Sequence, residues 1–228
     1  FGCSKKEDEI TVLTSTGYEP YEMIDKSGNL IGFDIELFNL LAAEAGYKVN
    51  WKDVSFDGVI ASLQANQADA AIAGITPTEL RSERVDFSKV YFDSSTGLMN
   101  CLVVSADSQL FKIEDLNGAV VSAQLGTIQA DLVEEIKSKY GFSTDLRNNN
   151  SQIAQEIISG RISAMMVESA VAETIVEQET TLRKIDLDII SESITGNAIA
   201  FTKGNTLVDE FNARLKIHKE NGKENKLS

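Results

Sequence analysis

Short apolar and β-branched runs alternate, early in the chain, with segments whose apolar positions recur at helical spacing. Residues 10–14 form a run that is typical of a strand. The apolar positions from Phe33 to Leu41 lie on one face of a predicted helix, which Gly46 ends. The pattern then predicts strands at 48–54 and 70–73, a helix through 59–63, and a brief helix at 79–84 that Thr78 caps.

The alternation stops near residues 93–97 and resumes after an extended run that ends at Val104. Strands and helices that alternate at this pace predict a parallel sheet covered by helices on both faces. Two such units predict an α/β protein of two lobes, between which the chain crosses twice. The second unit has predicted strands at 120–123 and 164–167, helices at 128–140, 151–159 and 169–178, and then an extended run at 198–201 and an amphipathic stretch at 206–221.

Boundaries follow from this division. We expect residues 1–9 to be a tether, residues 10–95 and 196–228 to form a discontinuous first lobe, and residues 96–195 to form the second. The chain has 228 residues, 43% of them hydrophobic, which is enough to bury one large core or two small ones. No stretch approaches the roughly 18 to 20 uninterrupted apolar residues of a membrane-spanning helix.

The formal net charge is −14, from 35 acidic and 21 basic residues spread along the chain. Nucleic acid is therefore excluded as the expected partner, because phosphate binding requires clustered Lys and Arg on one face. An acidic field attracts cations, including basic amino acids, although solubility explains the same charge without any function. No phosphate-binding loop and no Cys-His or other metal-ligand cluster is visible, so we expect no cofactor and no metal.

The two cysteines have different settings. Cys101 lies in an apolar run and is expected to be a small buried side chain, and two cysteines are too few for a disulfide scaffold. Cys3 follows Gly2 and precedes a short hydrophilic segment, which resembles the lipidated junction of a bacterial lipoprotein. A cysteine that lies by chance in a disordered terminus is the alternative interpretation.

Six segments together resemble the polar and basic amino-acid binding proteins of bacterial ABC importers, which have the type II periplasmic-binding-protein fold. They are YEPYE at 18–22, GFDIEL at 32–37, SFDGVI at 55–60, GITPTELRSERVDFS at 74–88, QLGTIQ at 124–129 and SGRISA at 159–164. Each segment is short, but the six occur in the family's order. The resemblance implies two Rossmann-like lobes joined by two hinge strands, with one free amino acid bound in the cleft between them.

The resemblance also implies a role for each site residue. Arg81 corresponds to the arginine that binds the ligand's α-carboxylate, with which a planar guanidinium can pair bidentately. Glu168 stands where the family usually has an Asp for the α-ammonium group. The other implied ligand contacts are Gly74 and Thr76, Gly126 and Thr127 before a predicted helix, and the aromatic pair Tyr18 and Phe56.

Taken without the resemblance, these residues have simpler interpretations. Arg81 would be a surface side chain paired with Glu79 or Glu83, Thr127 an ordinary helix cap, Phe56 a core residue, and Glu168 an acid favoured at a helix start.

The last group of candidates concerns selectivity. The far end of the pocket, where the family distinguishes its substrates, has the polar candidates Ser15, Glu22, Gln124 and Gln129.

The ligand expected from these features is arginine or lysine, because two aromatic faces and an acidic field suit a cationic side chain. Ser15 stands where some basic amino-acid binders have Asp, and serine cannot neutralise a guanidinium. Either another acid neutralises the ligand's side chain, or the ligand is glutamine or histidine. We expect an extracytoplasmic, lipid-anchored monomer that delivers its ligand to a membrane permease. The alternatives are a cyclohexadienyl-dehydratase-like enzyme with Glu168 as general acid, and the sensor domain of a receptor.

Overall fold

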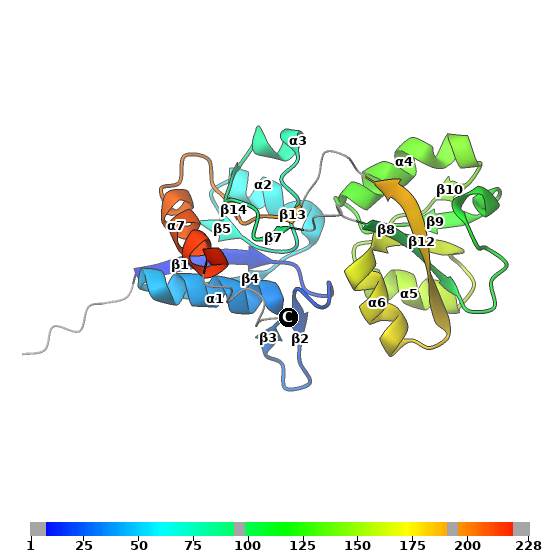
Figure 1. Cartoon of the computed structure of the whole chain (residues 1–228), viewed down its shortest axis with the longest axis horizontal. Helices are drawn as coiled ribbons and strands as arrows, with labels where there is room; N and C mark the ends of the chain where they lie inside the picture. The colour runs from blue at the N-terminus through cyan, green and yellow to red at the C-terminus, as the bar shows by residue number, and fades with distance from the viewer. Residues whose placement is uncertain (1–7, 94–98, 191–195, 221–228) are drawn as a thin grey trace, which may run out of the picture.

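The structure is a computed structural model that describes residues 8–93, 99–190 and 196–220 of the chain. Two five-stranded sheets, each with its own helices, form the two lobes visible in Figure 1. The first sheet has the order β4-β1-β5-β14-β6. Its strands are β1 (Asp8–Thr14), β4 (Tyr47–Asp53), β5 (Ala70–Ala71), β6 (Asp86–Phe87) and β14 (Ala200–Phe201).

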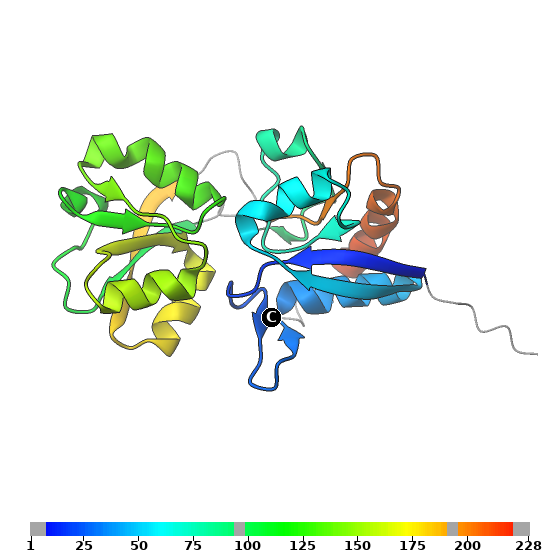
Figure 2. The same cartoon turned by 180° about the vertical axis from the view of Figure 1, so that it is seen from behind.

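Helices cover both faces of the first sheet, because successive side chains of a strand point to opposite faces. Ile10 and Val12 of β1 pack on the face covered by α1 (Phe33–Ala45) and α7 (Leu207–Glu220). Leu13 packs on the other face, against α2 (Val59–Gln64). Figure 2 shows α7, near the end of the described chain, beside the first part of the chain. The first lobe is therefore discontinuous in sequence.

The second sheet has the order β10-β9-β11-β8-β12 and is built on the same plan. α4 (Ile128–Tyr140) packs on one face, and α5 (Asn150–Ile158) and α6 (Ser169–Gln178) on the other. Cys101 belongs to this core and is fully buried, as the sequence predicts. The strands are β8 (Met99–Ser105), β9 (Val120–Ser122), β10 (Ser143–Thr144), β11 (Ala164–Glu168) and β12 (Leu182–Ile190), and a 3-10 turn, η2 (Ile113–Leu116), precedes β9.

Sequence prediction found most helices, and the parallel direction was right for some strands of each sheet and wrong for the others. α4 and α6 have the predicted bounds, and Gly46 ends α1 in the left-handed conformation with φ 82°. The sheets are mixed instead of parallel, because β14 pairs antiparallel with β5 and β6, and β8 pairs antiparallel with β11 and β12. β12 was not predicted, and β5 is shorter than the predicted strand.

Short elements lie near the junction of the lobes. β7 (Phe92–Asp93) pairs with β13 (Gly196–Asn197), so the two chain crossings run side by side. A small hairpin of β2 (Met23–Ile24) and β3 (Leu30–Ile31) precedes α1. The segment at 93–97, where the alternation was seen to stop, lies outside the described residues apart from Asp93. The predicted tether with Cys3 lies outside them apart from its last two residues. No helix in the described ranges is long and apolar enough to cross a membrane.

Candidate functional site between the lobes

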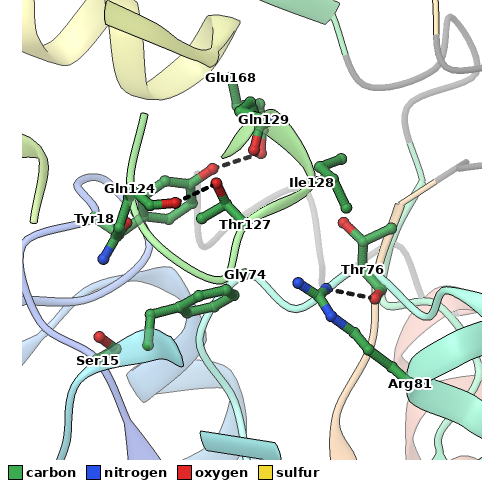
Figure 3. A pocket seen from close by; sticks show the side chains of 11 residues that line it. Ser15, Tyr18, Gly74, Thr76, Arg81, Gln124, Thr127, Ile128, Gln129 and Glu168 are labelled. Atoms are coloured by element: carbon green, nitrogen blue, oxygen red, sulfur yellow. Dashed lines mark hydrogen bonds between the residues drawn. The ribbon is translucent and has the colours of Figure 1, made fainter. Parts of the chain in front are cut away.

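A pocket lies between the two lobes and contains about 360 Å³ of space, part of it open to solvent. It brings together ten of the twelve binding residues predicted from the sequence; the exceptions are Gly126 and Glu22. These ten come from segments spread between residues 15 and 168 (Figure 3). The lining residues are Ser15, Tyr18, Phe56, Gly74, Thr76, Arg81, Gln124, Thr127, Ile128, Gln129 and Glu168.

Arg81 is held at the pocket by α3 (Glu79–Ser82), whose N-cap Thr78 accepts a hydrogen bond from the Arg81 amide. Its guanidinium donates to the Thr76 carbonyl at 2.8 Å and, across the interface, to the Gly126 carbonyl at 2.8 Å. Burial lowers the pKa of Arg81. No ion pair joins it to a carboxylate in the described part of the chain, so the surface pairing with Glu79 or Glu83 is wrong.

Gly126 is not among the residues that line the pocket, and its backbone lies against Asp57 of the first lobe. Its φ is +79°, and a Cβ at this position would lie 2.7 Å from the Cα of Asp57. Asp57 belongs to η1 (Phe56–Gly58) of the first lobe. A side chain at position 126 would therefore be strained and would also hold the lobes apart. Gly126 contributes its carbonyl oxygen to Arg81 instead of lining the pocket.

Glu168 lies at the end of β11 with only 4% of its surface exposed. Its carboxylate accepts hydrogen bonds from the Tyr21 hydroxyl at 2.6 Å and the Tyr18 hydroxyl at 3.2 Å, both from the first lobe. Burial raises the pKa of Glu168, and the two tyrosine hydrogen bonds oppose that rise. Glu168 precedes α6 but makes no side-chain cap hydrogen bond, so the helix-start interpretation does not account for its side chain.

The N-terminus of α4 forms another wall of the pocket. Thr127 is its N-cap: the hydroxyl accepts from the Ala130 amide at 3.1 Å and donates to the Gln124 carbonyl at 2.6 Å. The capping prediction is therefore confirmed. The following residue, Ile128, lines the pocket at the first turn, where helix N–H groups and the helix dipole favour an anion. Arg81 and this helix end can thus hold one carboxylate together.

The polar candidates for selectivity are placed differently. Ser15, Tyr18 and Gln124 lie on the left of the pocket in Figure 3, opposite Arg81 and Thr76. The Gln124 amide is held by the Asn148 carbonyl, to which it donates at 3.0 Å. Gln129 donates to the Asn100 carboxamide at 3.1 Å.

Glu22 does not line the pocket but lies fully buried behind it, hydrogen-bonded to Tyr18 through the backbone. Sequence reasoning proposed no role for Tyr21 and did not select Ile128. Tyr21 stands in the quoted YEPYE segment beside Tyr18, and that position was the available signal. Ile128 stands in the QLGTIQ segment at 124–129 but was not selected, because an apolar residue in the first turn of an amphipathic helix is typical of core.

Comparison with known proteins places this geometry in a family. The model of the bacterial extracellular solute-binding proteins, family 3, matches residues 10–228. The chain belongs to this family. The resemblance inferred from the sequence is thereby confirmed, and so is the two-lobed α/β fold.

Individual members of the family extend the comparison. The solute-binding protein is 36% identical to the arginine-binding extracellular protein ArtP of Bacillus subtilis over 99% of this chain and 87% of the relative. An ancestral arginine-binding protein bound to arginine superimposes with a TM-score of 0.85 and 33% identity, covering 96% of each chain. An ancestral arginine-binding protein bound to glutamine gives a TM-score of 0.85 and 32% identity, covering 97% and 96%.

Proposed function

We propose that this solute-binding protein is the substrate-binding subunit of an ABC amino-acid importer and closes on one free L-amino acid, arginine or lysine. The observation that carries the proposal is the pairing of opposite charges in the pocket. Arg81 comes from the first lobe and Glu168 from the second, and among the described residues they are the two charged side chains that line the pocket. A zwitterion offers a carboxylate to one and an ammonium group to the other.

In this arrangement the ligand's carboxylate lies between the Arg81 guanidinium and the first turn of α4. The ammonium group pairs with Glu168, and the Thr76 hydroxyl lies within the same pocket. Gly74 has φ +57°, and a Cβ there would lie 2.9 Å from the Tyr18 ring, so glycine lets the backbone pass beside this aromatic wall. The ligand's side chain then extends toward Ser15, Tyr18 and Gln124.

The preference for a basic ligand rests on the relatives and on the aromatic lining. Relatives named for arginine binding cover almost the whole chain. The aromatic side chains of Tyr18 and Phe56 line the pocket, and aromatic rings attract cations. Glutamine is the second candidate. It is favoured by the neutral lining at the far end and by the likeness to an ancestral arginine-binding protein bound to glutamine. Histidine stays an alternative of the same type.

A thermal-shift screen of the twenty amino acids tests the proposal. Ligand at a thousandfold excess over Kd stabilises the folded protein by about 4 kcal/mol. We expect a large shift with arginine or lysine and its loss in Arg81→Ala. An exposed arginine of the second lobe, Arg161, provides the matched control, Arg161→Ala, which should keep the shift. Absence of a shift with every amino acid would refute the proposal, whereas a shift with glutamine alone would refute only the ligand preference.

The remaining parts of the proposal concern the protein's setting. The two lobes, bounded as the sequence predicts, would close on the ligand as a monomer, and a membrane permease would recognise the closed form. Cys3 would carry the lipid that holds the protein at the outer side of the cytoplasmic membrane. Mass spectrometry of the protein from the native membrane tests the lipid. Small-angle scattering with and without ligand tests the closure, which predicts a smaller radius of gyration in the complex.

No catalysis is part of the proposal. A cyclohexadienyl-dehydratase-like reaction would use Glu168 as general acid, and burial does raise the pKa of this carboxyl. The ammonium group of a bound amino acid accounts for the same carboxylate without a reaction. Incubation with prephenate and arogenate separates the two functions, since turnover of either compound would establish an enzyme.

A further inference from the structure

Asp34 is an acid of the first lobe that has no role in the binding scheme above. It stands in the first turn of α1 and is fully buried. One carboxylate oxygen, Oδ2, accepts two hydrogen bonds, from the Gly74 amide at 2.7 Å and from the Tyr91 hydroxyl at 2.7 Å. The Asp34 amide donates to the Tyr21 carbonyl at 3.0 Å. Asp34 therefore joins three segments that are far apart in the sequence.

Two of these segments contribute groups to the proposed site, and the third is a firm support. Gly74 lines the pocket, and the Tyr21 hydroxyl donates to the carboxylate of Glu168 in the second lobe. Tyr91 is 3% exposed and belongs to the core of the first lobe. Its amide donates to the Asn197 carbonyl at 2.9 Å, beside the paired strands β7 and β13. The hydroxyl of Tyr91 thus reaches the acid from a fixed position.

The backbone at Gly74 requires such support. Gly74 lies three residues beyond the end of β5 and has φ +57°. Glycine has more backbone freedom to lose than any other residue. If the Gly74 backbone were free to move, the ligand would have to order it, and the cost of that ordering would lower the affinity. The hydrogen bond to Asp34 fixes this backbone within the first lobe, so it does not depend on closure.

We propose that Asp34 is a positioning residue for ligand binding, which holds Gly74 and Tyr21 in their binding arrangement before an amino acid enters. This inference rests on the proposed function. Tyr91 acts through Asp34, because its hydroxyl bonds to the same oxygen that holds Gly74. Gly74 contributes backbone to the pocket, and Tyr21 supports the carboxylate that pairs with the ligand's ammonium group. Every amino acid has that ammonium group, so the effect on affinity should be similar for ligands with different side chains.

Two substitutions at Asp34 separate positioning from charge. Asp34→Ala removes the acceptor of both hydrogen bonds. Asp34→Asn keeps it, since one oxygen accepts both bonds and the other, Oδ1, has no hydrogen-bond partner among the described residues. Titration calorimetry with arginine and with glutamine should show binding at least roughly tenfold weaker in Asp34→Ala, by a similar factor for both ligands. Asp34→Asn should stay within about threefold of wild type.

Tyr91→Phe tests the support behind Asp34, because it removes only the hydroxyl. Its affinity should fall about three- to tenfold. A role in folding alone would lower the melting temperature and leave the Gly74 backbone as rigid as before. The order parameter of the Gly74 amide, measured by NMR relaxation without ligand, should be about 0.85 in wild type and lower in Tyr91→Phe and Asp34→Ala.

The matched control is Asp69→Ala. The Asp69 carboxylate accepts a hydrogen bond from the Thr11 amide at 2.8 Å, and Asp69 precedes β5, whereas Gly74 follows that strand. The control therefore removes an acid that holds a backbone amide at the opposite end of the same strand. It should change neither the affinity for either ligand nor the order parameter of Gly74.

Several outcomes would overturn the inference. They are an affinity of Asp34→Ala within threefold of wild type, a loss in Asp34→Asn as large as in Asp34→Ala, and a loss confined to one of the two ligands. Where Asp34→Ala does not fold, an unchanged affinity together with an unchanged Gly74 order parameter in Tyr91→Phe would overturn it. Failure of wild type to bind any amino acid refutes the proposed function itself, and the order parameter, measured without ligand, still tests the support of Gly74.

Discussion

The hydrogen bond between Tyr21 and Glu168 joins the two lobes and provides a sharp test of closure. The Tyr21 hydroxyl donates to the Glu168 carboxylate at 2.6 Å, and both side chains are buried. Tyr21→Phe removes the hydroxyl and keeps the ring, which packs against core residues of the second lobe. The variant thus isolates one contact of the closed form.

The size of the effect follows from the chemistry of this contact. A hydrogen bond to a charged group stabilises by about 1.5 to 3 kcal/mol, which corresponds to a roughly 10- to 150-fold change in Kd. The bond exists only where the lobes meet, so its loss penalises the closed form and leaves the open form unchanged. The pKa of Glu168 should also rise further, since the Tyr21 hydrogen bond opposes its rise. We therefore expect weaker binding that weakens further as pH falls.

Titration calorimetry with the best ligand of the thermal screen measures this effect. The matched control is Tyr47→Phe, since the Tyr47 hydroxyl donates to Glu210 at 3.3 Å within the first lobe, away from the pocket. Tyr47→Phe should change the melting temperature more than the affinity. An affinity of Tyr21→Phe within threefold of wild type would show that closure does not depend on this bond, and the reasoning would be wrong.

Three further predictions follow from the site. Arg81→Lys keeps the charge but loses the planar fork, and calorimetry should show roughly 10- to 100-fold weaker binding. Gly126→Ala places a Cβ against Asp57 at φ +79°; scattering with ligand should show a less compact protein, at a cost of about 1 to 2 kcal/mol in folding stability. Burial raises the pKa of Asp34 to about 7, so the folded protein holds this proton more tightly than the unfolded chain. Denaturant unfolding should show stability falling as pH rises from about 4 to about 7, and Asp34→Asn should flatten that fall.

The positions of the helices could be predicted because their signals are local. Thr127 before α4 and Gly141 after it are ordinary start and stop residues, and α4 has the predicted bounds. The direction of the strands is not local. β14 runs antiparallel beside β5 although more than a hundred residues separate them, and nothing in the composition of either strand fixes that pairing. β12 was missed for a related reason, because charged residues interrupt its apolar positions.

The pocket could be predicted as a set of residues but not as a geometry. The family resemblance selected ten of the lining residues, eight of which lie in the six short segments. Whether a candidate side chain lines the pocket or is buried away from it could not be predicted. Glu22 has the same sequence signal as Ser15, yet Ser15 lines the pocket and Glu22 lies behind it. A carboxylate position of this kind depends on the packing of the Tyr18 turn against α1, which sequence spacing does not reveal.

In the proposed function, Glu168 links ligand binding and closure in one group. The neutral phenols of Tyr18 and Tyr21 donate hydrogen bonds to its carboxylate from the opposite lobe. They leave its negative charge uncompensated, and only a cation can neutralise that charge. The tyrosines oppose the rise of the Glu168 pKa that burial causes, so their hydrogen bonds favour the ionised carboxylate that an ammonium group requires. The ammonium group in turn makes the buried charge tolerable, so each event favours the other. Glutamate suits this position, since its added methylene relative to aspartate extends the carboxylate toward the two hydroxyl groups across the interface.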